Sequence, residues 1–142
     1  MAREQFIGTW KLVSSEYRFA DGERLKLYDT GILMYDAQGN MSVQLMQHNR
    51  PAFAKSDRLS GTLEEIKTAF QGYQAYYGTY TIDEKQRAVT HHLQGSLLPN
   101  WVGVDQVRYF DLEGDRLTLR TPTLPLRDRD AVGYLVWQRA EK

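Results

Sequence analysis

The stretch Gly8-Thr9-Trp10 opens the first strand-like run of the chain, and Trp137-Gln138-Arg139 closes the last one. In a closed β-sheet the first and last strands lie side by side, so matched motifs at the two ends of the chain indicate closure. Trp10 would then fill one end of a barrel, with the guanidinium of Arg139 stacked on its ring and bonded to nearby carbonyls. Gly8 allows the backbone to bend tightly just before this plug. The two stretches therefore predict a closed barrel.

Between these ends, short runs of β-branched, aromatic and apolar residues alternate with turn signals, which is the pattern of an antiparallel meander. Glycine-containing turns at residues 36–40 and 113–115 predict tight hairpins. The expected strands span residues 9–19, 31–35, 41–46, 79–83, 88–94, 106–112, 116–121 and 132–138. Eight strands form a barrel whose interior holds side chains or one small ligand. The predicted fold is all-β, an eight-stranded antiparallel up-and-down β-barrel in a single domain spanning residues 1–142.

One mid-chain segment departs from the strand pattern. Thr62-Leu63-Glu64-Glu65 has the sequence of a capping box, which starts an α-helix. Apolar residues at helical spacing follow from Ile66 to Tyr77, and Gly78 would end the helix in a left-handed conformation. We expect this helix to lie over the barrel mouth as a lid. The alternative is a helix packed on the outside of the barrel.

Composition excludes several classes of function. Eighteen basic residues balance eighteen acidic ones, so no net field favours nucleic acid or an anionic membrane. The absence of cysteine excludes disulfides, thiolate metal sites and a cysteine nucleophile. The N-terminal residues do not resemble a signal peptide, and no stretch is long and apolar enough to span a bilayer. We expect a cytoplasmic protein without nucleic-acid or membrane partners, whose aromatic-rich surface would support a homodimer.

Further stretches of the chain carry a family resemblance. They are Tyr35 with the run GNMSVQLM at residues 39–46, Arg50-Pro51, the run THHLQGSLLPNWVG at residues 90–103, and Gln106-Val107-Arg108. Together with the Gly-Thr-Trp start, they resemble the lipocalin-like domain family of bacteria and some fungi, within the wider calycin group of β-barrels. The resemblance covers nearly the whole chain. It implies an eight-stranded barrel with an internal pocket.

The chain also departs from the secreted lipocalins. Their helix follows the last strand, whereas the predicted helix here is mid-chain, and disulfides are absent. Transport of retinoid-like ligands is therefore not implied. Related barrels include cofactor-free enzymes, such as phenolic acid decarboxylases and allene oxide cyclases, so the fold does not decide between binding and catalysis.

Two adjacent histidines are the first candidates for a site. His91 and His92 lie on one predicted strand, so their side chains point to opposite faces. If Val89 and Leu93 face inward, His91 does so too and His92 meets solvent, although a bulge would exchange them. A three-histidine metal site would need both of them with His48, so we expect no metal. We also expect no other cofactor, and the alternative is haem ligation by one inward histidine. A buried histidine bonded to a neighbouring side chain is the plainer interpretation.

An arginine on a later strand is the second candidate. Arg108 shares a face with Gln106 and Phe110, and a buried guanidinium there would need an anion or several acceptors. The partner would be Glu16, which alternates in phase with Trp10, or a carboxylate or enolate of a ligand. The alternative places Arg108 on the outer wall in a weak surface pair.

Three further residues are expected near a ligand. Asn100 and Trp101 follow the histidine strand, and at a barrel rim they would clamp a flat apolar ligand. Alternatively, Trp101 seals the barrel end or contacts the helix. Tyr80 alternates with Ile82 and would point its hydroxyl inward as a donor or weak acid. The candidate ligand-binding residues are Glu16, Tyr80, His91, His92, Asn100, Trp101, Gln106 and Arg108.

The sequence contains neither a Gly-x-Ser-x-Gly nucleophile motif nor a glycine-rich phosphate loop. The leading hypothesis is a barrel that binds one small, largely apolar molecule of aromatic or polyketide-like structure. The alternative is a cofactor-independent cyclase, isomerase or decarboxylase. In that enzyme His91 or Tyr80 would move a proton and Arg108 would stabilise an oxyanion, with placed acid–base groups contributing about 10²–10⁴-fold. The third hypothesis is a structural module whose interior is filled by aromatic side chains.

Overall fold

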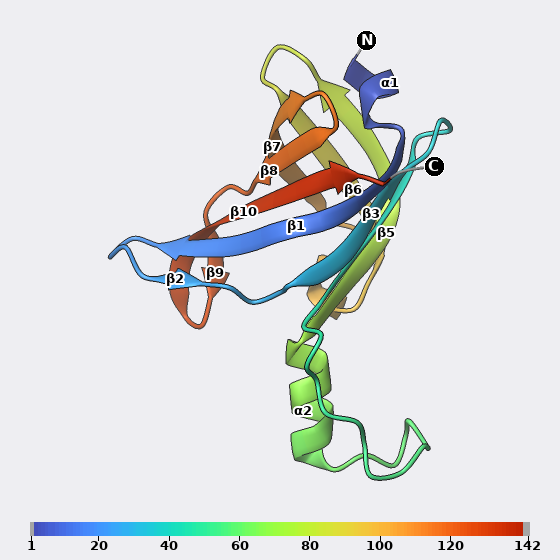
Figure 1. Ribbon diagram of the computed structural model, residues 1–142, viewed down its shortest axis with the longest axis vertical. Coiled ribbons are helices and arrows are strands. Elements are labelled where there is room, and N and C mark those ends of the chain that lie inside the picture. The colour runs from blue at the N-terminus through green and yellow to red at the C-terminus, as the bar shows by residue number, and fades with distance from the viewer. Residues whose placement is uncertain (1, 141–142) are drawn as a thin grey trace.

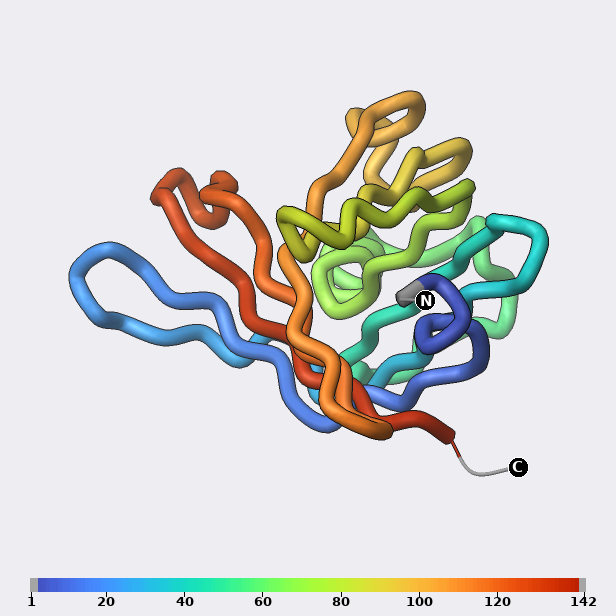
Figure 2. The backbone as a smooth tube through the Cα atoms, turned by 90° about the horizontal axis from the view of Figure 1, so that it is seen from above, coloured from blue at the N-terminus to red at the C-terminus, as the bar shows by residue number. Residues whose placement is uncertain are grey.

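Residues 2–140, which the computed structural model describes, contain ten β-strands joined in one antiparallel sheet (Figure 1). The strands are β1 (Gly8–Phe19), β2 (Arg24–Leu25), β3 (Thr30–Tyr35), β4 (Asn40–Met46), β5 (Tyr73–Asp83), β6 (Ala88–Ser96), β7 (Asp105–Glu113), β8 (Arg116–Arg120), β9 (Leu124–Leu126) and β10 (Arg129–Arg139). The barrel runs β1-β3-β4-β5-β6-β7-β8-β10, and pairing of β1 with β10 closes it. The short strands β2 and β9 pair only with β1 and β10, in two hairpins that reach beyond the barrel to the same side (Figure 2). The predicted eight-stranded up-and-down barrel is confirmed, with two additional short strands.

The seam between β1 and β10 carries the two motifs that predicted closure. Trp10 and Arg139 are directly opposed across it, and the guanidinium carbon of Arg139 lies 4.3 Å from the centroid of the Trp10 ring. The guanidinium also donates to the carbonyl of Ile7 at 2.9 Å and to that of Gln5. Gly8 has a φ of +134°, a conformation that other residues rarely adopt. The predicted closure of the barrel at this end is confirmed.

A short N-terminal helix, α1 (Ala2–Phe6), completes the closed end and was not predicted from the sequence. Seen from above, it lies over the strand ends near the N-terminus (Figure 2). Phe6 is fully buried and packs edge-on against Tyr35 and Phe110, with ring centroids 5.3 and 4.9 Å apart. The carbonyl of Phe6 accepts a hydrogen bond from Trp10 Nε1 at 2.9 Å. Aromatic rings therefore fill this end of the barrel.

The mid-chain helix α2 (Leu63–Gln71) begins as predicted but ends earlier. Thr62 is its N-cap, and the reciprocal capping box with Glu65 is present. Gly72, rather than Gly78, caps its C-terminus. The expected extension to Tyr77 is wrong because the chain enters β5 at Tyr73, where cross-strand pairing with β4 begins.

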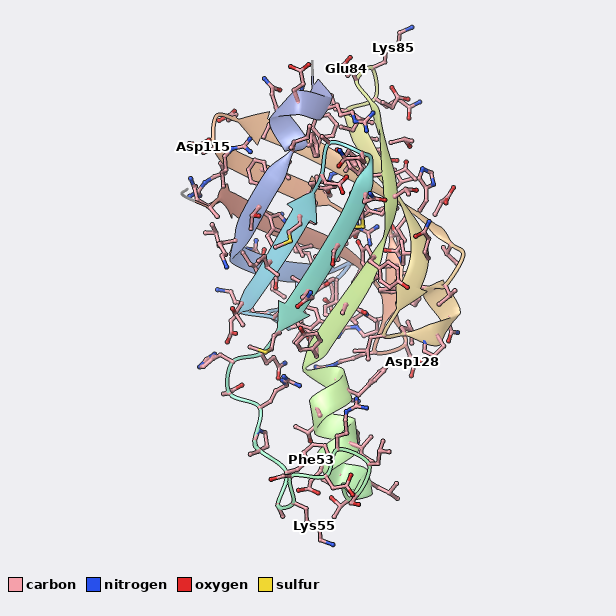
Figure 3. All side chains as sticks on the ribbon, turned by 90° about the vertical axis from the view of Figure 1, so that its right-hand side faces the viewer. Phe53, Lys55, Glu84, Lys85, Asp115 and Asp128 are labelled. Atoms are coloured by element: carbon pink, nitrogen blue, oxygen red, sulfur yellow. The ribbon has the colours of Figure 1, made fainter. Side chains whose placement is uncertain are left out.

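The helix α2 is not a lid. It projects away from the barrel beyond the start of β5, together with the loop that carries Phe53 and Lys55 (Figures 1 and 3). None of its residues is buried, and Leu63 is 88% exposed. Its apolar stripe therefore covers neither the barrel mouth nor the outer wall, and both expectations for this helix are wrong.

A β-bulge in β1 reverses the direction of its side chains. The register between β1 and β10 shifts between Leu12 and Ser14, so one residue of β1 has no partner there. An extra residue exchanges the inward and outward positions of everything that follows. Beyond the bulge, Tyr17 faces the interior and Glu16 faces the outer side. The predicted in-phase run from Trp10 to Glu16 is therefore wrong.

Candidate functional site

A cavity of about 210 Å³ occupies the barrel interior away from the aromatic plug. Each of the eight barrel strands contributes at least one inward-facing residue to its wall. The rim is formed by the segments around β2 and β9 and by the 3₁₀ turn η1 (Pro99–Trp101), which lie at the end opposite to α1 (Figure 1). The lining residues are Tyr17, Leu27, Tyr28, Leu33, Val43, Leu45, Gln74, Tyr76, His91, Leu98, Trp101, Arg108, Leu119, Thr121, Leu124, Pro125, Leu126, Leu135 and Trp137. A cavity of about 150 Å³ already takes up benzene, so this one has room for a substituted aromatic ring.

His91 lies at the centre of a buried chain of hydrogen bonds. Its Nε2 is 2.7 Å from the hydroxyl of Tyr35, and its Nδ1 is 2.8 Å from the hydroxyl of Tyr76. Burial lowers the pKa of His91 from 6.5 to about 3, and the nearby charge of Arg108 acts in the same direction. The imidazole is therefore neutral at pH 7, as its two uncharged partners allow.

The two tyrosines fix which nitrogen of His91 carries the proton. Tyr35 is buried, and within residues 2–140 its hydroxyl has no hydrogen-bond partner other than His91 Nε2. A buried hydroxyl proton without an acceptor is costly, so Tyr35 donates to Nε2. A neutral imidazole has one N–H, which is then on Nδ1 and donates to the Tyr76 oxygen. The hydroxyl proton of Tyr76 remains available, and Tyr76 lines the cavity.

Among residues 2–140, Arg108 is the one charged residue of the cavity wall. Its guanidinium donates to the backbone carbonyl of Val107 at 2.9 Å and to the side-chain oxygen of Gln106. In the described part of the chain, no carboxylate forms an ion pair with it. Its charge opposes the rise that burial causes in the pKa of Tyr76 and of Tyr17, two residues that line the same cavity.

A tryptophan completes the polar part of the wall. Trp137 is 1% exposed, and its indole Nε1 has no hydrogen-bond partner among the described residues. Buried donors are usually paired, so such an N–H indicates a site that a water or ligand oxygen would satisfy.

Three predicted residues line this cavity, namely His91, Trp101 and Arg108. Trp101 lies in η1 and packs edge-on against Tyr76, with ring centroids 6.2 Å apart. Gln106 does not line the cavity, but its amide oxygen holds the guanidinium of Arg108 from the same strand. Their roles in ligand binding remain predictions.

Two other predicted residues do not reach the cavity. The carboxylate of Glu16 accepts from Arg18 Nε at 2.8 Å, on the outer side of the barrel, so the expected pair of Glu16 with Arg108 does not form. Tyr80 points inward as predicted, but it lies at the closed end, 4.7 Å from the Tyr35 ring. Its hydroxyl donates to the Asp36 carbonyl at 2.8 Å and does not line the cavity.

The remaining two candidates lie on the surface. His92 is bonded to Asp105 at 2.8 Å and to Thr81 at 3.0 Å, on the outer face of β6. Its neighbour His91 is 1% exposed, so the two histidines point to opposite faces of the strand, as the alternation predicted. Asn100 is exposed in η1 and does not contribute to the wall.

Among the residues that sequence reasoning missed, four aromatic ones matter most for the cavity and its hydrogen-bonded chain, namely Tyr17, Tyr35, Tyr76 and Trp137. Tyr76 was assigned to the helix, although its place in β5 puts it against His91. Tyr17 was missed because of the bulge, and Trp137 was read only as part of the closing motif. Tyr35 entered only through the family resemblance. The abundance of tyrosine was the one available signal, because a tyrosine offers both a ring and a hydroxyl to a cavity.

The fold and the cavity define a class of protein, the lipocalin-like barrels with an internal pocket. The chain belongs to the lipocalin-like domain family, which it matches over residues 7–140. It is also 33% identical over 106 residues to the 4'-hydroxy-3'-methoxypropiophenone carrier protein ppsC of Aspergillus oryzae, a match that covers 70% of this chain and 96% of that protein. The family resemblance seen in the sequence is confirmed.

Within residues 2–140, no group of three or more histidine, cysteine, aspartate or glutamate side chains is placed to hold a metal ion. The helices of the same residues are all too short or too polar to cross a membrane.

Proposed function

We propose that this protein is a carrier that binds one small, single-ring aromatic molecule in the barrel cavity. The observation that carries the proposal is a cavity of about 210 Å³ whose wall is built from all eight strands. Its size suits one substituted ring. A related protein is named as a carrier of 4'-hydroxy-3'-methoxypropiophenone, a compound with one substituted aromatic ring.

The contacts of the candidate proton-transfer groups favour binding over catalysis. Both nitrogens of His91 are occupied by tyrosine hydroxyls, and with a pKa of about 3 it is a poor base at neutral pH. The hydroxyl of Tyr80 is used on a backbone carbonyl at the closed end. We therefore expect a bound aromatic molecule to be recovered chemically unchanged after incubation with the protein.

Titration with 4'-hydroxy-3'-methoxypropiophenone tests the proposal. Trp101 and Trp137 line the cavity, so saturable quenching of their fluorescence is expected as the ligand binds. Trp101→Ala removes one aromatic wall, and an affinity loss of about five- to tenfold is expected from the lost ring contact. Val104→Ala is the matched control, since Val104 lies close along the chain and is not part of the wall. Quenching that does not saturate, or equal losses in the two variants, would argue against binding in this cavity.

A further inference from the structure

The polar groups that face the cavity are arranged to donate hydrogen bonds. Arg108 has only donors, the indole Nε1 of Trp137 is an unpaired donor, and the hydroxyl proton of Tyr76 is left free by His91. Two acceptors of the wall are already engaged: the side-chain oxygen of Gln74 accepts from the backbone amide of Ala75, and the Thr121 hydroxyl oxygen accepts from that of Gly133. The Nε1 of Trp137 therefore remains without an acceptor among the described residues.

The cavity also carries one uncompensated positive charge. No aspartate or glutamate belongs to its wall, and the guanidinium of Arg108 bonds only neutral oxygens within residues 2–140. A partly buried charge is costly unless an opposite charge or several dipoles compensate it. A ligand that supplies a negatively charged oxygen would compensate Arg108 and satisfy the neighbouring donors together.

We propose that the cavity binds its aromatic ligand as a phenolate, with the ionised ring oxygen held between the guanidinium of Arg108 and the hydroxyl of Tyr76. This inference rests on the proposed carrier function and adds the ionisation state of the ligand. A phenolate fits the donor set because one oxygen accepts several hydrogen bonds from converging donors. A hydroxyl para to a ketone, as in the compound named for the related carrier, is acidified by that ketone.

The protein groups around Arg108 do not titrate near neutral pH. They are the hydroxyls of Tyr17, Tyr28 and Tyr76 in the wall, the imidazole of His91, and the hydroxyl of Tyr35 behind it, whose pKa burial also raises. Burial raises the pKa of all three wall tyrosines, to about 12 for Tyr28, and lowers that of His91 to about 3. Any dependence of affinity on pH between roughly 5 and 9 is therefore assigned to the ligand itself.

The absorption spectrum of the bound ligand tests the inference on the unmodified protein. A phenolate absorbs at longer wavelength than its phenol, so the probe is 4'-hydroxy-3'-methoxypropiophenone at a pH about one unit below its own pKa in solution. The bound probe is expected to show the phenolate spectrum, and its affinity should fall about tenfold per pH unit below that pKa. Its 4'-O-methyl ether cannot ionise, so it should bind at least tenfold more weakly and without pH dependence.

Variants test whether the charge of Arg108 causes the stronger binding of the phenol than of its methyl ether. Arg108→Gln should abolish the preference for the phenol over the methyl ether, whereas Arg58→Gln removes an exposed arginine outside the cavity and should leave it intact. Tyr76→Phe deletes one oxygen while keeping the ring, and it should weaken phenolate binding about five- to tenfold but ether binding less.

The outcomes separate this inference from the function on which it rests. A probe bound with the spectrum of the neutral phenol, or a methyl ether bound equally well, overturns the inference and leaves the carrier function standing. Failure of both compounds to bind overturns the carrier function and the inference with it. If Arg108→Gln does not fold, the spectrum of the ligand bound to the unmodified protein and the affinities of the Tyr76→Phe variant still test whether the ligand binds as a phenolate.

Discussion

Acidification should destabilise the barrel through His91. This imidazole is buried between the hydroxyls of Tyr35 and Tyr76, and its pKa is lowered from 6.5 to about 3 mainly by burial. In the unfolded chain it regains its ordinary pKa. Between about pH 6.5 and 3, His91 is therefore protonated in the unfolded state but stays neutral in the folded state. The free energy of unfolding then falls by about 1.4 kcal/mol per pH unit. The stability that neutral His91 contributes is fully present above about pH 6.5 and is lost as the pH falls towards 3. Between pH 6.5 and 4.5 the free energy of unfolding therefore falls by roughly 2–3 kcal/mol.

Urea unfolding at a series of pH values measures this effect. Carboxylates also lose stabilising contacts in acid, so the informative quantity is the difference between the unmodified protein and His91→Gln, in which no imidazole titrates. We expect the variant to be less stable at pH 7, because its hydrogen bonds with the tyrosines are imperfect, and the gap to narrow by roughly 2–3 kcal/mol by about pH 4.5. His92→Gln, on the outer face of the same strand, is the control and should leave the acid slope of the unmodified protein unchanged. Parallel pH profiles for the unmodified protein and His91→Gln would refute the argument.

Four further substitutions, one of them a control, test the architecture by urea unfolding. Arg139→Ala removes the stacking on the tryptophan and two hydrogen bonds to carbonyls, so a loss of roughly 2–4 kcal/mol is expected, and a loss below about 1 kcal/mol would contradict closure by this seam. Leu63→Ser, on the exposed face of α2, should change stability by less than about 0.5 kcal/mol and leave ligand affinity unaltered; a larger change would mean that this face is covered. Gly78→Ala would put a Cβ 1.9 Å from the backbone oxygen of His92 and should cost about 2–4 kcal/mol. Gly103→Ala meets no neighbour and should cost only about 1–2 kcal/mol for its left-handed backbone, so equal losses at the two glycines would contradict the close approach of β5 and β6.

The parts of the fold that were predictable depend on local patterns. Closure followed from Trp10 and Arg139 because their contact requires the chain ends to be adjacent. The start of α2 followed from the capping box, because its two partners, Thr62 and Glu65, lie only three positions apart in the sequence. The inward position of His91 followed from the alternation of apolar residues in β6, a strand with regular pairing over residues 88–92.

Other parts were not predictable because the deciding contacts are distant in sequence. The tyrosines between Tyr73 and Tyr80 fit a helical repeat as well as a strand repeat, and pairing with β4 decides for the strand. Helix α1 is too short to carry a helical pattern, and it is held by Phe6 in the barrel end. Tyr76 reaches His91 across the pairing of β5 with β6, which the helical interpretation of residues 66–77 did not include.

The bulge in β1 sets the electrostatic character of the cavity. With strict alternation, the carboxylate of Glu16 would face inward, where it would pair with Arg108 and neutralise the site. The extra residue instead turns Glu16 outward, where Arg18 at 2.8 Å and Arg24 at 3.3 Å hold it, and brings the hydroxyl of Tyr17 to the wall. The backbone irregularity that sequence periodicity did not predict is thus the reason that Arg108 has no carboxylate partner in the described part of the chain. Selectivity for an acidic aromatic ligand, as we propose, would then depend on the register of β1 as much as on the arginine itself.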